Sequence, residues 1–157
     1  MSAKTASVGA DAPDFTLPRD GGGSVTLSHL RPGKVVLYFY PKDDTPGCTL
    51  EAQDFTALKS QFDANGTTVI GISKDSAAKH DKFCKKYGLS VTLASDENGS
   101  TCEDYGVWTE KSMYGKTYMG IERTTFLIDG TGKIARIWNK VSVKGHADEV
   151  LEAARAL

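Results

Sequence analysis

The sequence lacks any hydrophobic run that could span a membrane. Its longest apolar stretch, Val35–Tyr40, has six residues, whereas a spanning helix needs about 20. The N-terminal segment, MSAKTASVGADAP, also lacks the apolar stretch of about 7–15 residues that marks a secretory signal. We therefore expect a cytoplasmic protein that does not insert into a membrane.

Positive charge is not in excess either. The chain has 19 lysines and arginines against 20 aspartates and glutamates, which gives a net charge of -1. Surfaces that bind duplex nucleic acid or anionic lipid usually carry a basic excess. The composition therefore gives no reason to expect nucleic acid or a membrane surface as a partner.

Cysteine is scarce, with three residues at widely spaced positions. An odd, scattered set does not form a disulfide framework, so these cysteines are expected to be packing residues, metal ligands or catalytic groups. The residue three positions after Cys48 is Glu51. The chain thus lacks the Cys-x-x-Cys motif of thiol-disulfide oxidoreductases, which argues strongly against that class.

The rest of the composition is that of an ordinary soluble domain. Of 157 residues, 39% are hydrophobic and 25% are charged, and no repeat or linker divides residues 1–157, so we expect a single domain with one substantial core. Residue patterns predict strands at 35–40, 67–73, 91–94, 124–128 and 134–138, helices at 49–62, 76–87 and 147–156, and an N-terminal β-hairpin from 15–18 to 24–27. This order predicts a central mixed sheet flanked by helices, compatible with a thioredoxin-like α/β fold.

The segment PKDDTPGCT follows the apolar run directly and contains the candidate nucleophile. With Thr45 as N-cap and Pro46 as the first helical residue, Cys48 is the third residue of a helix. Its sulfur would lie among unpaired N–H groups at the positive end of the helix dipole. A partly shielded thiol in this setting is stabilised as thiolate.

A stabilised thiolate does not by itself explain fast catalysis. A lower thiol pKa raises the thiolate fraction but weakens the nucleophile, so the net gain is only about two- to three-fold. Donors aimed at the oxygen that gains charge would contribute more. The sequence offers the hydroxyl of Thr45 and the guanidinium of Arg123. Thr45 could instead act only as a cap, and Arg123 only as an ion-pair partner of Glu122 or another carboxylate.

A metal site is the main alternative use of the remaining candidate ligands. His80 and Cys84 are four residues apart on one helix face and could both reach one ion. His29 and His146 lie far away in the sequence and have polar neighbours. Solvated or core-edge histidines are therefore the better interpretation, and we expect no metal.

The aromatic stretch before Arg123 has two open interpretations. Trp108, Tyr114, Tyr118 and Met119 lie in VWTEKSMYGKTYMG. They could line a substrate pocket, or they could belong to a loop that covers the domain.

The segment PKDDTPGC matches the Pro-x-x-x-Thr-x-x-Cys pattern of peroxiredoxins. Its extension TPGCTLEAQDF, together with APDFTL, YGVW and RTTFLIDGTGKI, resembles the bacterioferritin comigratory protein or peroxiredoxin Q branch over almost the whole chain. The resemblance implies a thioredoxin fold and a hydroperoxide reductase that uses no cofactor. Hydrogen peroxide and organic hydroperoxides are the implied substrates.

The resemblance also implies roles for individual residues. Cys48 would be the peroxidatic nucleophile that becomes a sulfenic acid. Thr45 and Arg123 would orient the peroxide, and Pro41 would shield the sulfur from water. The N–H groups of Gly47 and Cys48 would help to hold the substrate.

The second half of the catalytic cycle is less uniform in this family. Many members have another cysteine five residues after the first, where this chain has Gln53. The resemblance favours Cys84 as the resolving thiol, and its neighbouring lysines would favour a thiolate. The carboxylates of Glu103 and Asp104 beside Cys102 would disfavour one. A third possibility is that no internal thiol resolves the sulfenic acid.

If Cys84 resolves, several consequences follow. The two cysteines would form an intramolecular disulfide, which requires unwinding at Cys48 and near Gly88 because the Cα atoms must approach within about 7 Å. The resemblance implies thioredoxin as the reductant, and a monomer would suffice. A redox sensor that oxidises Cys48 without turnover remains an alternative to the peroxidase.

Overall fold

The computed structural model describes residues 6–157, so part of the N-terminal segment considered above as a signal lies outside this range. Helices and strands follow in the order β1 (Thr16–Pro18), β2 (Ser24–Thr26), η1 (Leu27–Leu30), β3 (Lys34–Phe39), α1 (Pro46–Ala57), α2 (Lys59–Ala64), β4 (Thr67–Ser73), α3 (Ala77–Tyr87), β5 (Thr92–Ser95), α4 (Thr101–Asp104), β6 (Trp108–Met113), β7 (Lys116–Ile121), β8 (Thr124–Ile128), β9 (Ile134–Trp138) and α5 (His146–Ala156). No helix in the described range is long and apolar enough to cross a membrane.

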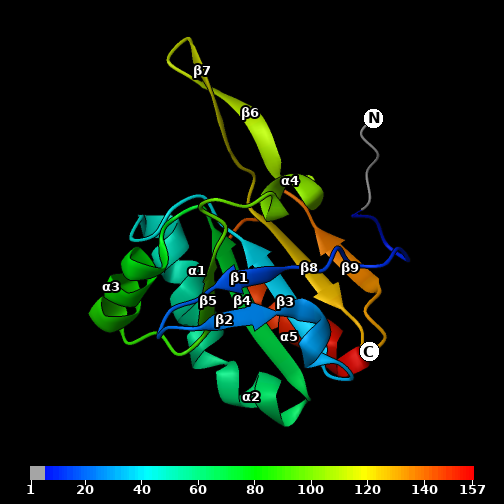
Figure 1. The fold of residues 1–157 in the computed structure, drawn as a ribbon. Coiled ribbons are helices and arrows are strands. Elements are labelled where there is room, and N and C mark those ends of the chain that lie inside the picture. The colour runs from blue at the N-terminus through cyan, green and yellow to red at the C-terminus, as the bar shows by residue number, and fades with distance from the viewer. Residues whose placement is uncertain (1–5) are drawn as a thin grey trace.

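A five-stranded mixed sheet in the order β5-β4-β3-β8-β9 forms the centre of the molecule (Figure 1). The strands β3, β4 and β5 pair in parallel, whereas β8 pairs antiparallel with β3 and β9. The apolar run of β3 is buried on both faces, as expected for a central strand. This is the thioredoxin-like arrangement, with its N-terminal β1–β2 hairpin, that the sequence predicts.

The longer helices all pack against one face of this sheet. Their buried side chains pack against Val36, Tyr38 and Tyr40, which are every second residue along β3 and just after it. We call this set of buried side chains the helix-side cluster. α1, α2, α3 and α5 all contribute to it. Cys48 belongs to this cluster and Cys84 packs against it.

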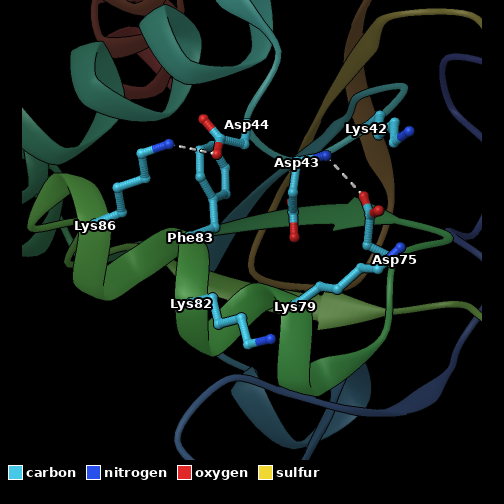
Figure 2. A pocket seen from close by; sticks show the side chains of 8 residues that line it. All are labelled: Lys42, Asp43, Asp44, Asp75, Lys79, Lys82, Phe83 and Lys86. Carbon is cyan, nitrogen blue, oxygen red and sulfur yellow. Dashed lines mark hydrogen bonds and ion pairs between the residues drawn. The ribbon is translucent and has the colours of Figure 1, made fainter.

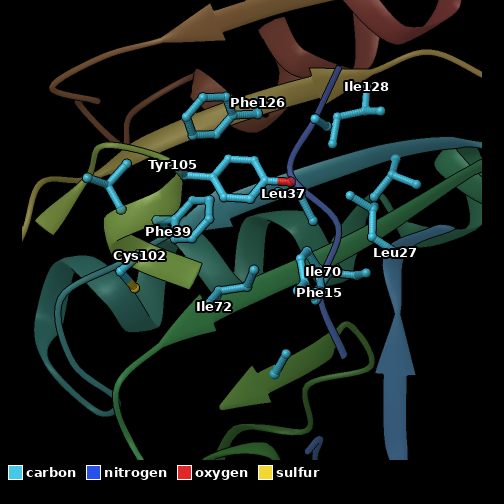
Figure 3. Close-up of a cluster of buried hydrophobic side chains, with 14 of the residues drawn as sticks. Phe15, Leu27, Leu37, Phe39, Ile70, Ile72, Cys102, Tyr105, Phe126 and Ile128 are labelled. Carbon is cyan, nitrogen blue, oxygen red and sulfur yellow. The ribbon is translucent and has the colours of Figure 1, made fainter. Parts of the chain in front are cut away.

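The opposite face is covered by the N-terminal hairpin, the short helix α4 and the segment that follows it. There Val35, Leu37 and Phe39 of β3 form the hairpin-side cluster with Tyr105 and Cys102 (Figure 3). Since successive side chains of a strand point to opposite faces, the sheet lies between the two clusters. Cys102 is therefore separated by the sheet from the other two cysteines.

The stretch before Arg123 corrects the sequence interpretation. It forms an antiparallel hairpin, β6–β7, that projects away from the domain (Figure 1). Trp108 packs on the hairpin-side cluster, but Tyr114, Tyr118 and Met119 are 97%, 47% and 49% exposed. The three exposed side chains therefore neither line a buried pocket nor cover the core, because β6 and β7 pair with each other beyond the edge of the domain.

The predicted helix at 49–62 is in fact two helices. α1 starts at Pro46, as the Thr45–Pro46 signal predicts and three residues before the hydrophobic pattern begins, and Leu58, with φ -99° and ψ 3°, interrupts the helical backbone before α2. The N–H of Leu58 still donates to the carbonyls of Asp54 and Phe55. After the break, α2 buries Phe62 in the helix-side cluster.

Candidate active site

The thiol of Cys48 lies at the N-terminus of α1. The helix starts at Pro46 directly after the N-cap Thr45, so Cys48 is its third residue, as predicted. The first helical hydrogen bond runs from the N–H of Thr49 to the carbonyl of Thr45 at 2.8 Å. The N–H groups of Gly47 and Cys48 therefore precede the helical ladder, where the helix dipole is positive.

The side chain of Thr45 does not cap the helix. Its hydroxyl donates to the carbonyl of Lys42 at 3.0 Å and so closes the loop before α1. Thr45 is half-buried, and Pro41 is exposed at the start of the same loop. The loop itself, rather than the helix end, orients the hydroxyl three residues before the thiol.

Arg123 reaches the sulfur from the other side of the site. Its Nη2 donates to Sγ of Cys48 at 3.3 Å. Two backbone hydrogen bonds fix the segment that carries Arg123. The N–H of Glu122 donates to the carbonyl of Val107 at 2.8 Å, and the N–H of Val141 donates to the carbonyl of Arg123 at 3.0 Å. The structure thus brings together the two residues that the sequence places 75 positions apart.

Glu51 is a third member of the site that the sequence prediction missed. Nη1 of Arg123 donates to its Oε1 at 2.6 Å, so of the expected ion-pair partners, Glu122 or another carboxylate, the structure has another carboxylate, Glu51. Burial raises the pKa of Glu51 to about 7, although the charge and hydrogen bond of Arg123 act in the opposite direction. The available signal was an acidic residue on the inward stripe of α1, next to Ala52, because a buried carboxylate needs a partner.

The arrangement holds a buried sulfur against a cationic donor. Cys48 is 1% exposed, but it faces the guanidinium as well as hydrocarbon. A side chain at Gly47 would place its Cβ 3.2 Å from Nη2, so glycine leaves room for this approach. A guanidinium and unpaired N–H groups stabilise a thiolate and the charge that develops on an attacked oxygen.

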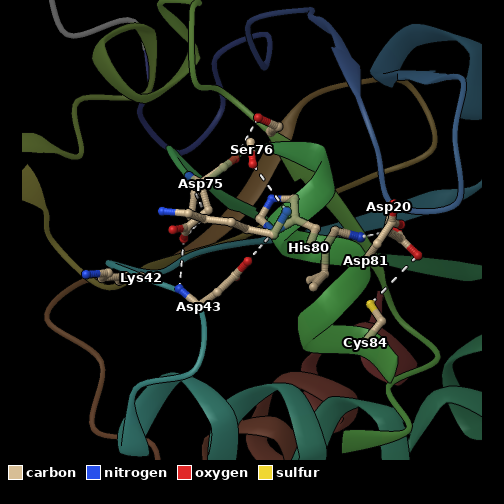
Figure 4. Close-up of polar contacts among 12 residues, drawn as sticks. Asp20, Lys42, Asp43, Asp75, Ser76, His80, Asp81 and Cys84 are labelled. Carbon is tan, nitrogen blue, oxygen red and sulfur yellow. Dashed lines mark hydrogen bonds and ion pairs between the residues drawn. The ribbon is translucent and has the colours of Figure 1, made fainter. Parts of the chain in front are cut away.

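Cys84 lies on α3, and its environment differs from the prediction. Its Sγ donates to Oδ2 of Asp20 at 3.8 Å (Figure 4). Burial, followed by the charge of Asp20, raises the pKa of this thiol to about 12. The expectation that neighbouring lysines favour its thiolate is wrong, because Lys85 and Lys86 are exposed while a carboxylate faces the sulfur.

Cys102 is fully buried in the hairpin-side cluster. Burial, and then the charge of Asp96, raises the pKa of its thiol far above the usual value. Among the carboxylates, Asp96 raises the pKa of Cys102 more than Glu103 does. The prediction that nearby carboxylates disfavour the Cys102 thiolate has the correct direction. Burial and a raised pKa both disfavour the thiolate of Cys102, and the side chain lies on the opposite face of the sheet from Cys48.

The alternative metal ligands are engaged with different partners. His80 contacts Asp43 and the carbonyl of Ala94, and Cys84 bonds to Asp20, so the two do not converge. His146 is also buried, contrary to expectation, and bonds to the hydroxyl of Thr125 at 2.8 Å. No group of three potential ligands that could hold an ion occurs within residues 6–157.

Comparison with known proteins gives a consistent family relationship. Residues 8–137 match the sequence profile described as the AhpC/TSA family. The putative peroxiredoxin bcp of Coxiella burnetii is 54% identical over 144 residues, which are 92% of this chain and 95% of the relative. The residues that match the family profile include Cys48, Cys84 and Arg123.

Two solved structures from Xanthomonas campestris are similar throughout. Peroxiredoxin Q superposes with a TM-score of 0.86 and 46% identity, covering 90% of each chain. The bacterioferritin comigratory protein, studied in trapped intermediate and ligand complexes for its alkyl peroxide reduction activity, has a TM-score of 0.86 and 45% identity, again over 90% of each chain.

Proposed function

The chain belongs to the AhpC/TSA family and to its Bcp or peroxiredoxin Q branch, and from this membership we propose that Cys48 reduces hydrogen peroxide and organic hydroperoxides. The observation that supports this assignment most is the 3.3 Å contact between Sγ of Cys48 and Nη2 of Arg123. Alkyl hydroperoxides are included because the similar protein from Xanthomonas campestris is associated with alkyl peroxide reduction.

In the proposed first step, the thiolate of Cys48 attacks one oxygen of the peroxide. An S–O bond forms as the O–O bond breaks, so the sulfur loses two electrons and becomes a sulfenic acid. The departing hydroxide or alkoxide takes a proton and leaves as water or alcohol. Arg123 and the N–H groups of Gly47 and Cys48 stabilise the charge on this oxygen, Thr45 orients the peroxide, and Pro41 limits access of water.

We assign the second step to Cys84. Its sulfur attacks the sulfenic sulfur of Cys48, an S–S bond forms, and the hydroxyl leaves as water with the thiol proton. Both cysteines lie on the helix-side cluster, which favours Cys84 over Cys102. Cys48 and Cys84 lie on separate helices, and a disulfide requires their Cα atoms within about 7 Å. The first turn of α1 and the end of α3 near Gly88 are therefore proposed to unwind before the disulfide closes.

The disulfide is proposed to be reduced by thioredoxin, a small dithiol protein that attacks one of the two sulfurs. Because both cysteines belong to one chain, a monomer can complete the cycle. The cytoplasm is the proposed location, since the scattered cysteines suit a reducing compartment.

Replacing Cys84 with serine is expected to separate the two steps. The variant should still convert Cys48 to sulfenic acid with one equivalent of peroxide, because the first step does not use Cys84. Its steady-state turnover with thioredoxin, thioredoxin reductase and NADPH should fall to background. Intact mass and the NADPH-coupled rate measure the two steps.

Cys102→Ala is the matched control for this experiment and should keep wild-type turnover. Unchanged turnover in Cys84→Ser would contradict the assignment of the resolving thiol. Oxidation of the wild type without turnover would instead favour a redox sensor. Reduction of insulin disulfides without peroxide consumption would favour a thiol-disulfide oxidoreductase.

A further inference from the structure

A buried ion pair connects the loop before Cys48 to the helix that carries Cys84. His80, on the inner face of α3, is 0% exposed. Its Nδ1 lies 2.7 Å from Oδ2 of Asp43, and its Nε2 lies 2.9 Å from the carbonyl oxygen of Ala94 (Figure 4). The hydroxyl of Tyr40 donates to the other carboxylate oxygen of Asp43 at 2.5 Å.

These partners determine the protonation of the pair. The carbonyl of Ala94 only accepts a hydrogen bond, so Nε2 of His80 donates to it, and the contact between Nδ1 and an ionised Asp43 then needs a second proton on the ring. A neutral imidazole has one N–H and would leave a lone pair facing an oxygen of Asp43 or Ala94. The contact between Asp43 and His80 therefore depends on one proton that the pair holds.

The same loop has weaker attachments beside this pair. Asp44 accepts from Lys86 at 2.8 Å, but both side chains are exposed, so this ion pair contributes little. The N–H of Asp43 donates to Asp75 at 2.8 Å (Figure 2). The hydroxyl of Tyr87 on α3 also donates to Oδ1 of Asp44 at 2.5 Å, again at an exposed position. A hollow of about 230 Å³ lies between the loop and α3. The pair with His80 is therefore the buried polar contact between these two segments, whereas the contacts of Asp44 are exposed.

The positions of the cysteines give this contact a role in catalysis. Cys48 follows Asp43 by five residues, and Cys84 follows His80 by one helical turn. We propose that the Asp43–His80 pair is a proton-dependent latch: it holds the peroxide-reactive loop on α3 and slows the unwinding that joins Cys48 to Cys84. His80 is thus a positioning residue, and this role rests on the function proposed above.

The latch predicts a direction for pH. The titratable groups around the ring are Asp43 from the loop, Tyr40 from the end of β3 and Asp75 from the turn before α3, while β5 contributes the carbonyl of Ala94. Burial opposes the charge of His80, but the hydrogen bond and charge of Asp43 outweigh it and raise its pKa. The stabilisation that the Asp43–His80 contact gives to the folded loop is therefore complete below about pH 6.5, the pKa of an unperturbed histidine. It is lost as the pH rises through the higher pKa that His80 has in the folded protein.

The test measures the rate constant of Cys48–Cys84 disulfide formation after one equivalent of hydrogen peroxide, by rapid quenching and mass spectrometry from pH 6 to pH 10. His80→Gln and Asp43→Asn should each form the disulfide about 10-fold faster than wild type at pH 6, with the ratio approaching 1 at high pH. The double variant should be no faster than either single variant, because the interaction is already lost. Lys86→Gln, which breaks the exposed ion pair of the same loop, is the matched control and should match wild type.

If the ratio of variant to wild-type rate constants stays near 1 at pH 6, or does not change with pH, the latch is overturned while the proposed function stays intact. Absence of a Cys48–Cys84 disulfide in the wild type would instead overturn both. Amide hydrogen exchange of the reduced wild type tests the latch without any substitution. After correction for intrinsic exchange, residues 43–50 should open more often at high pH than at pH 6, and equal opening would contradict the latch.

Discussion

Replacing Cys48 with serine is expected to abolish peroxide consumption. A serine hydroxyl at the same helix N-terminus ionises far less readily than a thiol and is a poor nucleophile toward an O–O bond, whereas Arg123 and the loop remain in place. Consumption should therefore fall to the rate of the uncatalysed reaction with the reductant. The measurement is loss of hydrogen peroxide and of an alkyl hydroperoxide in the presence of dithiothreitol.

Cys102→Ala is the matched control because it removes another buried thiol on the opposite face of the sheet. This variant should consume peroxide at the wild-type rate. Retained consumption in Cys48→Ser, or its loss in Cys102→Ala with the fold intact, would contradict the assignment of the nucleophile.

Replacing Arg123 with methionine is expected to slow the first oxidation of Cys48 by about 10²–10³-fold, the usual loss when one transition-state donor is removed. The guanidinium contacts Sγ of Cys48 and Oε1 of Glu51 with different nitrogens. A lysine offers one ammonium in place of this planar fork, so Arg123→Lys should recover only part of the rate. Stopped-flow measurement of the reaction of reduced protein with peroxide gives the rate constant.

Arg155→Met provides the control for loss of a charge at the surface. Arg155 is exposed on α5 and bonds to Glu152 and Gln61, so its replacement should leave the oxidation rate unchanged. A similar rate for Arg123→Met and wild type would show that the contact with the sulfur has no catalytic role.

The local parts of this structure follow directly from the sequence. The runs at β4, β8 and β9 have the predicted bounds because apolar, β-branched residues are bordered by turn residues. The helix start at Pro46 is confirmed, and the local signal that holds is proline at the first helical position, because the side chain of Thr45 makes no capping bond. Cys48 could therefore be placed at a helix N-terminus from its neighbours alone.

The partners of the site residues depend on contacts between distant segments. The sequence names Arg123 but not its bond to Glu51, and it pairs Cys84 with nearby lysines although the contacting charge is Asp20, 64 positions away. The same holds for Asp43 and His80, which meet only when the loop packs on α3. The β6–β7 hairpin was missed because the aromatic residues in it indicate burial, whereas their strands pair with each other outside the core.

The most direct test of the whole account is peptide mapping of the wild-type protein after one equivalent of hydrogen peroxide. The account predicts one dominant product, a peptide pair linked through Cys48 and Cys84, with Cys102 recovered as a free thiol. A product linked through Cys102, or only disulfides between separate chains, would contradict it.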